Sequence, residues 1–166
     1  MTQDEIFQNG EGDQWYERNK GKLIPKDDFV CRMIESIGVQ PRRIVEVGCS
    51  NGYRLEYLRQ KFHAVCYGYD ISNEAIEAGR DAFPEIHLEQ KVLHEIPYDK
   101  TFDLVICNFV LHWVDRSFLV PSMSRIDALV RRGGTLVIGD FNPDYQQKRK
   151  YHHLPDEEVY TYKQDY

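Results

Sequence analysis

The chain alternates between short apolar runs and longer segments in which apolar residues recur every three or four positions. The short runs predict buried strands, and the longer spacing predicts amphipathic helices. Strands that alternate with helices favour a doubly wound parallel α/β sheet covered on both faces. The expected strands are 42–48, 64–70, 86–93, 102–110 and 134–141, and the expected helices are 27–38, 51–62, 72–83 and 118–130, the last disturbed near Pro121.

The ends of the chain differ from this alternating core. Residues 1–26 are a polar leader, and residues 142–166 hold five tyrosines but only Leu154 and Val159 as aliphatic residues, so the tail cannot build its own core. A chain of 166 residues with 42% hydrophobic content is long enough for one substantial core. We therefore expect a single domain over residues 1–166, with its core at 27–141 and peripheral segments at 1–26 and 142–166.

Charge and cysteine content narrow the class of protein. A net charge of −6 disfavours a surface that follows nucleic-acid phosphates, although residues 148–150 form a basic run. The four cysteines are Cys31, Cys49, Cys66 and Cys107, and they include no C-x-x-C pair. They are expected to be reduced, as in a cytoplasmic protein. With no signal-peptide pattern and no long apolar run, the sequence predicts a soluble protein without a membrane partner.

The turn after the first expected strand is the first candidate for ligand binding. In an open parallel sheet, ligands bind beyond the carboxyl ends of the strands. The run VEVGCSNG (45–52) places Ser50 and Tyr53 where a dinucleotide-binding G-x-G-x-x-G turn needs glycine. Glu46 would repel a pyrophosphate but would complement a cationic ligand such as S-adenosylmethionine, which carries a sulfonium and an ammonium. Without its context, the turn would be equally consistent with a purely structural role.

The spacing Glu46-x-Gly48-x-Ser50-x-Gly52 resembles the first motif of class I S-adenosylmethionine-dependent methyltransferases, E/D-x-G-x-G-x-G, with serine at the middle glycine. Asp70 ends the second expected strand, where an acid accepts both ribose hydroxyls. The resemblance covers about residues 40–141 and implies a Rossmann-like sheet of order 3-2-1-4-5, with S-adenosylmethionine as cofactor and S-adenosylhomocysteine as product. The cofactor-binding residues it implies in the core are Glu46, Gly48, Cys49, Ser50, Asn51, Gly52, Asp70, Ile71, Val92, Leu93 and Asn108.

Several of these positions have a plainer interpretation. The segment VLHEIPY (92–98) resembles the family's adenine-contacting loop, but Val92 stands at the usual acidic position. Asp70 is also suited to capping the helix that follows Ser72, and Asn108 to satisfying a carbonyl at the strand end. Cys49 follows a strand and precedes a helix, so it is a candidate for an exposed, low-pKa nucleophile, but no histidine is placed by the sequence to activate it.

Candidates for acceptor chemistry follow the fourth and fifth strands and lie in the tail. Methyl transfer needs mainly positioning, with a base where the acceptor holds its proton tightly. His112 is the best-placed base, although it is equally consistent with a packing histidine, and Asp140, His152 and His153 are further catalytic candidates. The adjacent histidines lack the additional ligands that a metal site needs, so no metal is expected.

The resemblance implies that residues 1–26 close over the cofactor as a lid and that residues 142–166 lie on the acceptor side. Within the leader, GDQWYERN (12–19) contains Tyr16 and Arg18, which are candidates for holding the methionine carboxylate. The alternative is that this segment is a surface helix. Together with the tail YHHLPDEEVYTYKQDY (151–166), this segment resembles methylases associated with the biosynthesis of pseudaminic acid and related sugars. The resemblance implies a sugar or sugar-nucleotide hydroxyl or amine as the acceptor.

One departure from the class concerns the last strands. The sixth and seventh strands usual in class I methyltransferases are absent from the expected pattern, which suggests a truncated domain or a homodimer through the exposed sheet edge. A non-catalytic methyltransferase-like accessory domain is the alternative function. An NAD-dependent dehydrogenase is disfavoured by the glycine spacing and by Glu46.

Overall fold

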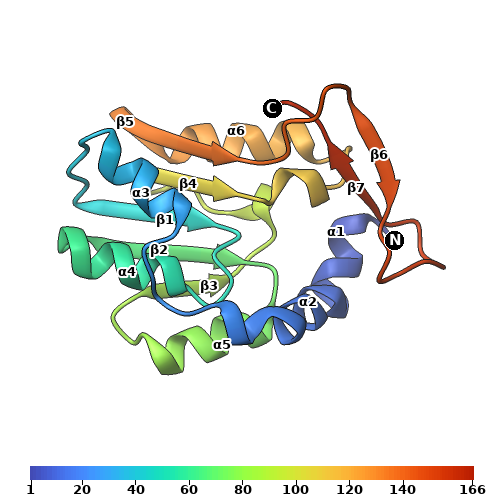
Figure 1. The fold of residues 1–166 in the computed structure, drawn as a ribbon, viewed down its shortest axis with the longest axis horizontal. Helices are drawn as coiled ribbons and strands as arrows, with labels where there is room; N and C mark the ends of the chain where they lie inside the picture. Colours follow the sequence, from blue (N-terminus) through green and yellow to red (C-terminus); the bar gives the residue numbers. More distant parts are fainter.

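The computed structural model describes residues 1–166 as a parallel sheet with helices on both faces (Figure 1). The five strands lie in the order β3-β2-β1-β4-β5, all pairs parallel, which confirms the predicted topology. The strands are β1 (Arg43–Val47), β2 (Val65–Asp70), β3 (His87–Gln90), β4 (Phe102–Asn108) and β5 (Val130–Gly139), and the helices between them are α4 (Tyr53–Phe62), α5 (Asn73–Ala82) and α6 (Leu119–Leu129), with α3 (Phe29–Ser36) before β1. None of the helices is both long and apolar enough to cross a bilayer.

Two hydrophobic clusters lie on opposite faces of the sheet. The first cluster joins α3, α4 and α5 to strand residues that include Ile44 and Leu104. The second cluster joins α6 to Val45 and Val105, which point to the other face because side chains alternate along a strand. Glu46 shares the face of Ile44 and therefore lies under α3 and α4.

The ends of the elements agree with the expected ranges to within a few residues, with two informative exceptions. Pro121 does not disturb α6, because it lies in the first turn, where no backbone N–H partner is required. The last strand begins at Val130 rather than at 134, directly after α6, and its pairing with β4 shifts register between Phe102 and Leu104. The irregular pairing explains why the alternating pattern of β5 is weak in its first half.

The tail forms strands that the sequence did not predict. β6 (Gln147–Lys150) and β7 (Tyr160–Lys163) pair antiparallel as a separate two-stranded sheet that does not join the main sheet. Tyr151 and Val159 from the tail are buried against Phe7, so the tail completes a small cluster with the N-terminal segment. The main sheet thus has five strands and lacks the usual sixth and seventh, as expected, and the two short strands of the tail are an addition that the sequence did not predict.

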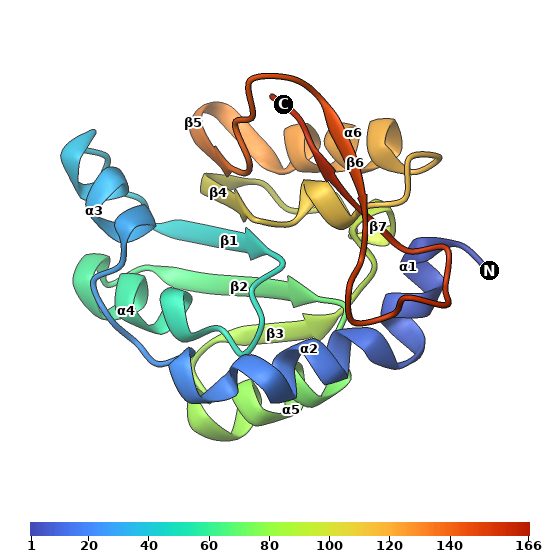
Figure 2. The ribbon, with the colours of Figure 1, turned by 45° about the vertical axis from the view of Figure 1, so that its right-hand side comes forward.

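The N-terminal segment lies over the carboxyl ends of the strands, beside the tail (Figures 1 and 2). It comprises α1 (Gln3–Ile6), a π-helical turn (Phe7–Glu11) and α2 (Gly12–Asn19), followed by a single 3₁₀ turn (Lys20–Lys22). At the start of α5, Ser72 Oγ donates a hydrogen bond to Asp13 at 2.6 Å. This hydrogen bond helps to hold the segment at the edge of the sheet where a ligand is predicted to bind.

Gln3 joins this segment to two other parts of the chain. Its buried amide donates to the carbonyl oxygens of Trp113 at 2.6 Å and Tyr160 at 2.8 Å, and its Oε1 accepts the N–H of Tyr160 at 2.8 Å. The neighbouring Asp4 accepts the N–H of Asp115 at 2.8 Å. The N-terminus, the loop after β4 and β7 are thus tied together by side chains of α1.

We predict that Gly79→Ala destabilises the fold. In most exposed helices the change from glycine to alanine stabilises by about 1 kcal/mol. In α5, however, a Cβ at Gly79 would lie 2.4 Å from the carbonyl oxygen of Asn51, a backbone atom that cannot move aside. Overpacking of this kind costs about 1–3 kcal/mol, which lowers the Tm of a chain of this size by roughly 2–4 °C per kcal/mol.

The Tm and the urea midpoint would be compared with those of Gly21→Ala, where a Cβ meets nothing within 4 Å. Little change is expected for this control. A Gly79→Ala protein that is as stable as the control would contradict the packing of α5 against the turn after β1.

Candidate active site

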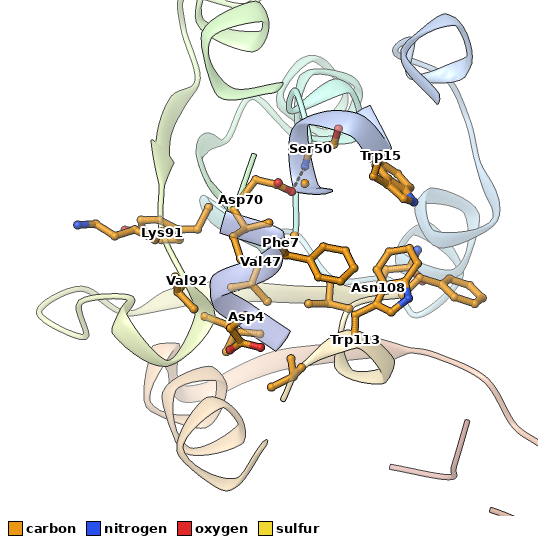
Figure 3. Close-up of a pocket in the computed structure, with 18 of the residues that line it drawn as sticks. Asp4, Phe7, Trp15, Val47, Ser50, Asp70, Lys91, Val92, Asn108 and Trp113 are labelled. Atoms are coloured by element: carbon orange, nitrogen blue, oxygen red, sulfur yellow. Dashed lines mark hydrogen bonds between the residues drawn. The ribbon is translucent and has the colours of Figure 1, made fainter. Parts of the chain in front are cut away.

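A cavity of about 470 Å³ opens at the carboxyl ends of β1, β2 and β4, beneath the N-terminal segment (Figure 3). Of its 24 lining residues 15 are hydrophobic, which is the composition of a small-molecule site with a few polar groups. Figure 3 shows Asp70, Lys91 and Val92 on one side of the cavity, and Trp15, Asn108 and Trp113 on the other. The cavity therefore has a polar end and an aromatic end, the latter lined by Phe7, Trp15, Phe109, Trp113 and Phe141.

The turn after β1 forms the floor of the cavity. Gly48, Ser50 and Gly52 all have positive φ values, of 71°, 52° and 76°. Glycine is required at position 48, because a Cβ there would lie 2.2 Å from Val110. Ser50 adopts the same left-handed region with a side chain, and its hydroxyl oxygen is buried without a partner. Gly48 and Ser50 line the cavity, so the first-motif turn meets it at these two positions.

Asp70 connects this turn to the end of β2. Its carboxylate accepts the N–H of Ser50 at 2.7 Å and the N–H of Ser72 at 2.9 Å. Burial raises the pKa of Asp70, while the amides of Ser72 and Ser50 oppose the shift. Asp70 also lines the cavity. The residue thus organises the turn and the start of α5, with Ser72 itself capping the helix, and it presents an acid at the polar end.

Glu46 lies behind the turn and outside the cavity wall. It is fully buried and forms an ion pair with Arg54, whose Nε donates to Asp28 at 2.9 Å. Burial raises the pKa of Glu46 to about 7, although Arg54 favours its charged form. The second carboxylate oxygen, Oε2, has no hydrogen-bond partner. Arg54 itself lines the cavity, so its guanidinium, paired with the two acids, stands between Glu46 and the cavity.

Three other residues of the turn have structural contacts instead of a place on the wall. Cys49 is buried against Gly68, and burial raises the pKa of its thiol well above the ordinary value. The interpretation of Cys49 as an exposed thiol with a low pKa is therefore wrong. Asn51 accepts the N–H of Tyr53 at 3.2 Å and donates to the carbonyl of Leu23 at 3.2 Å. Gly52 packs on Leu88 at the start of α4.

The polar end is completed by the loops after β2 and β3. Ile71, Val92 and Leu93 line the cavity as an apolar surface beside Asp70. Val92 and Leu93 are buried, and Val92 offers no side-chain hydrogen bond. Asn108 lines the cavity from the end of β4, where its Oδ1 lies 2.3 Å from the position that a Cβ on Gly139 would occupy. These four predicted residues are therefore brought together around one space.

His112 and Asp140 form a buried pair beside the aromatic end. The Nδ1 atom of His112 lies 2.9 Å from Asp140 Oδ1, and the backbone N–H of His112 donates to Asp140 Oδ2 at 3.2 Å. The imidazole is packed against Trp113, Phe141 and Phe109, with ring centroids 4.4, 5.0 and 5.9 Å away. His112 lines the cavity and Asp140 does not, so the carboxylate supports the imidazole from behind.

The other candidates from the two ends of the chain lie away from the cavity. His152 and His153 are exposed in a turn between β6 and β7, with ring centroids 3.9 Å apart. Tyr16 is buried outside the wall, and Arg18 forms an ion pair with Glu11 and donates to the Tyr151 hydroxyl at 3.1 Å. These four residues are not brought together with the cofactor turn.

Several wall residues were missed by sequence reasoning. Asp4 and Phe7 come from a leader that has no periodic pattern, and Phe141 from the second position after β5. Phe109 was part of the expected strand but lies just after it, at a turn. The position of Phe109 directly after a buried strand was the feature of the sequence that could have identified it as a wall residue. Among histidines, cysteines and acids, no group of three or more gathers where it could hold a metal ion.

Comparison with known proteins agrees with this arrangement. A family described as "Methyltransferase domain" matches residues 19–164. A malonyl-[acyl-carrier protein] O-methyltransferase of Halalkalibacterium halodurans is 25% identical over 113 residues, which is 63% of this chain and 41% of that protein. The chain spans about two fifths of the length of the first curated relatives it matches.

Solved structures share the fold at low sequence identity. The sugar N-methyltransferase KedS8 from a Streptoalloteichus species has a TM-score of 0.64 at 19% identity, covering 83% of this chain and 60% of that chain. The SAM-bound amino pentose methyltransferase CalS10 from Micromonospora echinaspora has a TM-score of 0.60 at 20% identity, covering 87% and 61%. The family match extends over most of the sequence. The chain therefore belongs to the methyltransferase domain family.

Proposed function

We propose that this chain catalyses S-adenosylmethionine-dependent methyl transfer to a small-molecule acceptor, a sugar or sugar-nucleotide hydroxyl or amine. The observation that carries the proposal is the single cavity in which the first-motif turn and Asp70 meet the His112–Asp140 pair. The likeness to two sugar methyltransferases supports a sugar acceptor at the level of the fold.

The residues of the polar end fit the cofactor. Glu46 and Asp28 surround one cation, Arg54, so with both acids ionised the group carries one excess negative charge. The unpartnered Oε2 of Glu46 adds an unused buried acceptor. When Glu46 is ionised, this excess charge favours a cationic ligand nearby. Asp70 is available to the ribose hydroxyls, and Ile71, Val92 and Leu93 offer an apolar surface to the adenine.

The chemistry assigned to the chain's own residues is positioning and proton removal. The cofactor, when bound, supplies a methyl group on a positively charged sulfur, ready for in-line displacement. His112 accepts the acceptor's proton at Nε2, because the hydrogen bond of Nδ1 to Asp140 favours the tautomer with the proton on Nδ1. Asp140 then stabilises the imidazolium that forms, as an acid does in other His–acid pairs.

We predict that the acid at the end of β2 controls cofactor affinity. Asp70→Ala removes a charged acceptor from the cavity and frees the amide of Ser50, so the Kd for S-adenosylmethionine should rise by about 10- to 100-fold. Calorimetric titration measures this change, with Glu77→Ala as the control, since Glu77 is an exposed acid on α5, the helix that follows β2, and is paired with Arg80. Equal affinities in the two variants would contradict the assignment, and absence of binding in the unaltered chain would contradict the cofactor.

We also predict that cofactor affinity rises with pH between about 5.5 and 7.5. The raised pKa of Glu46 leaves it mostly protonated below about 7, and ionisation then adds negative charge beside the cationic ligand. The expected gain is at most about tenfold per pH unit, accompanied by proton release on binding. Titrations with S-adenosylmethionine would be compared with 5′-methylthioadenosine, which lacks the cationic groups and should show no such trend. A Glu46→Gln protein that retains the full pH dependence would refute this assignment.

Turnover distinguishes an enzyme from a non-catalytic accessory domain. With radiolabelled S-adenosylmethionine and a panel of sugars and amino sugars, methyl transfer should depend on His112. His112→Ala should lower kcat by about 10²- to 10⁴-fold while leaving cofactor affinity unchanged. Cofactor binding without methyl transfer to any member of the panel would favour the accessory role.

A further inference from the structure

The backbone of Phe109 is in a conformation that bulky residues rarely adopt. Its φ is 56°, in the left-handed region, where a side chain with a Cβ is disfavoured. Such strain persists only where neighbouring structure fixes it, and it is concentrated at functional sites. A glycine or asparagine at this position would satisfy the turn at lower cost. The presence of a phenylalanine therefore needs a reason beyond the turn.

Contacts on both sides hold this backbone in place. The N–H of Phe109 donates to the carbonyl of Gly139 at 2.7 Å. The preceding Asn108 fills the space where Gly139 lacks a Cβ, and the following Val110 fills the space beside Gly48. The strained residue is thus fixed between β5 and the cofactor turn.

The ring of Phe109 is presented at the aromatic end of the cavity. Phe109 lies on the cavity wall and is 49% exposed, although it is a large apolar residue. Its ring meets Phe141 edge to face, with centroids 5.3 Å apart, and meets His112 in a similar way at 5.9 Å. An exposed aromatic face beside the proposed base suits contact with a ring-shaped acceptor.

The charges near this end disfavour an anionic acceptor. Arg54 is paired with Glu46 and Asp28, and Lys91 lies at the opposite, polar end. Lys163 stacks on Phe141 with its Nζ 4.1 Å from the ring centroid but does not line the cavity. A phosphate or carboxylate at the aromatic end would lose its hydration without gaining a free cation there.

We propose that Phe109 is a specificity-determining residue whose ring stacks on the acceptor, and that the acceptor is a ring-shaped hydroxyl or amine compound without a phosphate or carboxylate. This inference rests on the proposed function and narrows it, since it favours a free sugar or other uncharged ring over a nucleotide-linked one. An amine is compatible, because aromatic faces also attract cations.

The test uses variants that separate strain from recognition. Phe109→Gly removes both the ring and the strain, and Phe109→Tyr retains the ring. His63→Gly is the matched control, because His63 has a φ of 53° at the end of α4 and does not line the cavity. Each protein would be measured for Tm, for S-adenosylhomocysteine affinity by calorimetry and for acceptor binding by tryptophan fluorescence.

Fluorescence is suited to this site because the chain has two tryptophans, Trp15 and Trp113, and both line the aromatic end. Two matched pairs of probes are titrated in the presence of S-adenosylhomocysteine. The first pair is D-glucosamine and D-glucosamine 6-phosphate, and the second is tyramine and 4-hydroxyphenylacetate. Within each pair the ring is alike, and only the second member carries an anionic group.

We expect the unaltered chain to bind the non-anionic member of at least one pair about tenfold more tightly than the anionic member. Phe109→Gly should weaken that binding by about tenfold and raise Tm by about 2–6 °C, while leaving the affinity for S-adenosylhomocysteine within about twofold. Phe109→Tyr should restore binding, and His63→Gly should raise Tm alone.

Unchanged probe binding in Phe109→Gly would overturn the inference, as would a fall in its Tm, which would indicate a packing role. Equal binding of both members of each pair, or no binding of any probe, would overturn the stated acceptor class. All these results leave the proposed function intact as long as S-adenosylhomocysteine binds. Failure of the unaltered chain to bind S-adenosylhomocysteine would instead contradict the proposed function.

Discussion

The partly buried carboxylate of Asp70 is the constraint on which the arrangement of the cavity depends. An ionised acid at the end of a central strand must be satisfied by donors, and the available donors are the amides of Ser50 and Ser72. These hydrogen bonds fix the turn after β1 to the start of α5. Tyr69 adds to the same junction, since its carbonyl accepts the N–H groups of Gly48 and Cys49 at 2.7 and 3.2 Å. The floor of the cavity is thus a hydrogen-bonded seam between β1 and β2, and the left-handed turn follows from it.

The hydrophobic pattern was sufficient to predict the sheet, because the inner strands β1, β2 and β4 are mainly apolar runs that alternate with helical segments. The pattern also contained the true orientation of Glu46: Ile44 and Glu46 are two residues apart on one strand and so share a face. Its partner Arg54 was not predictable, since it comes from the next helix and its pairing depends on how that helix packs. Glu46 is therefore adjacent to the turn that lines the cavity, but its direct contact is Arg54 and not the cavity itself.

The aromatic end shows why the rest of the site escaped prediction. Its rings come from the N-terminal segment, the turn after β4 and the second position after β5, and no local spacing relates these segments. The tail strands were missed for a similar reason: their buried residues, Tyr151 and Val159, need Phe7 from the other end of the chain to form a cluster. His152 and His153 were predicted to lie near the acceptor, but the packing of the tail on the N-terminal segment leaves them on the surface.

The amide of Gln3 has a mechanical consequence for the whole chain. It fastens the first helix to β7 and to the loop that carries His112, so the N-terminal segment over the cavity is held to the far end of the sequence by one side chain. Lifting the first helix away from both segments therefore breaks all three hydrogen bonds of a single amide.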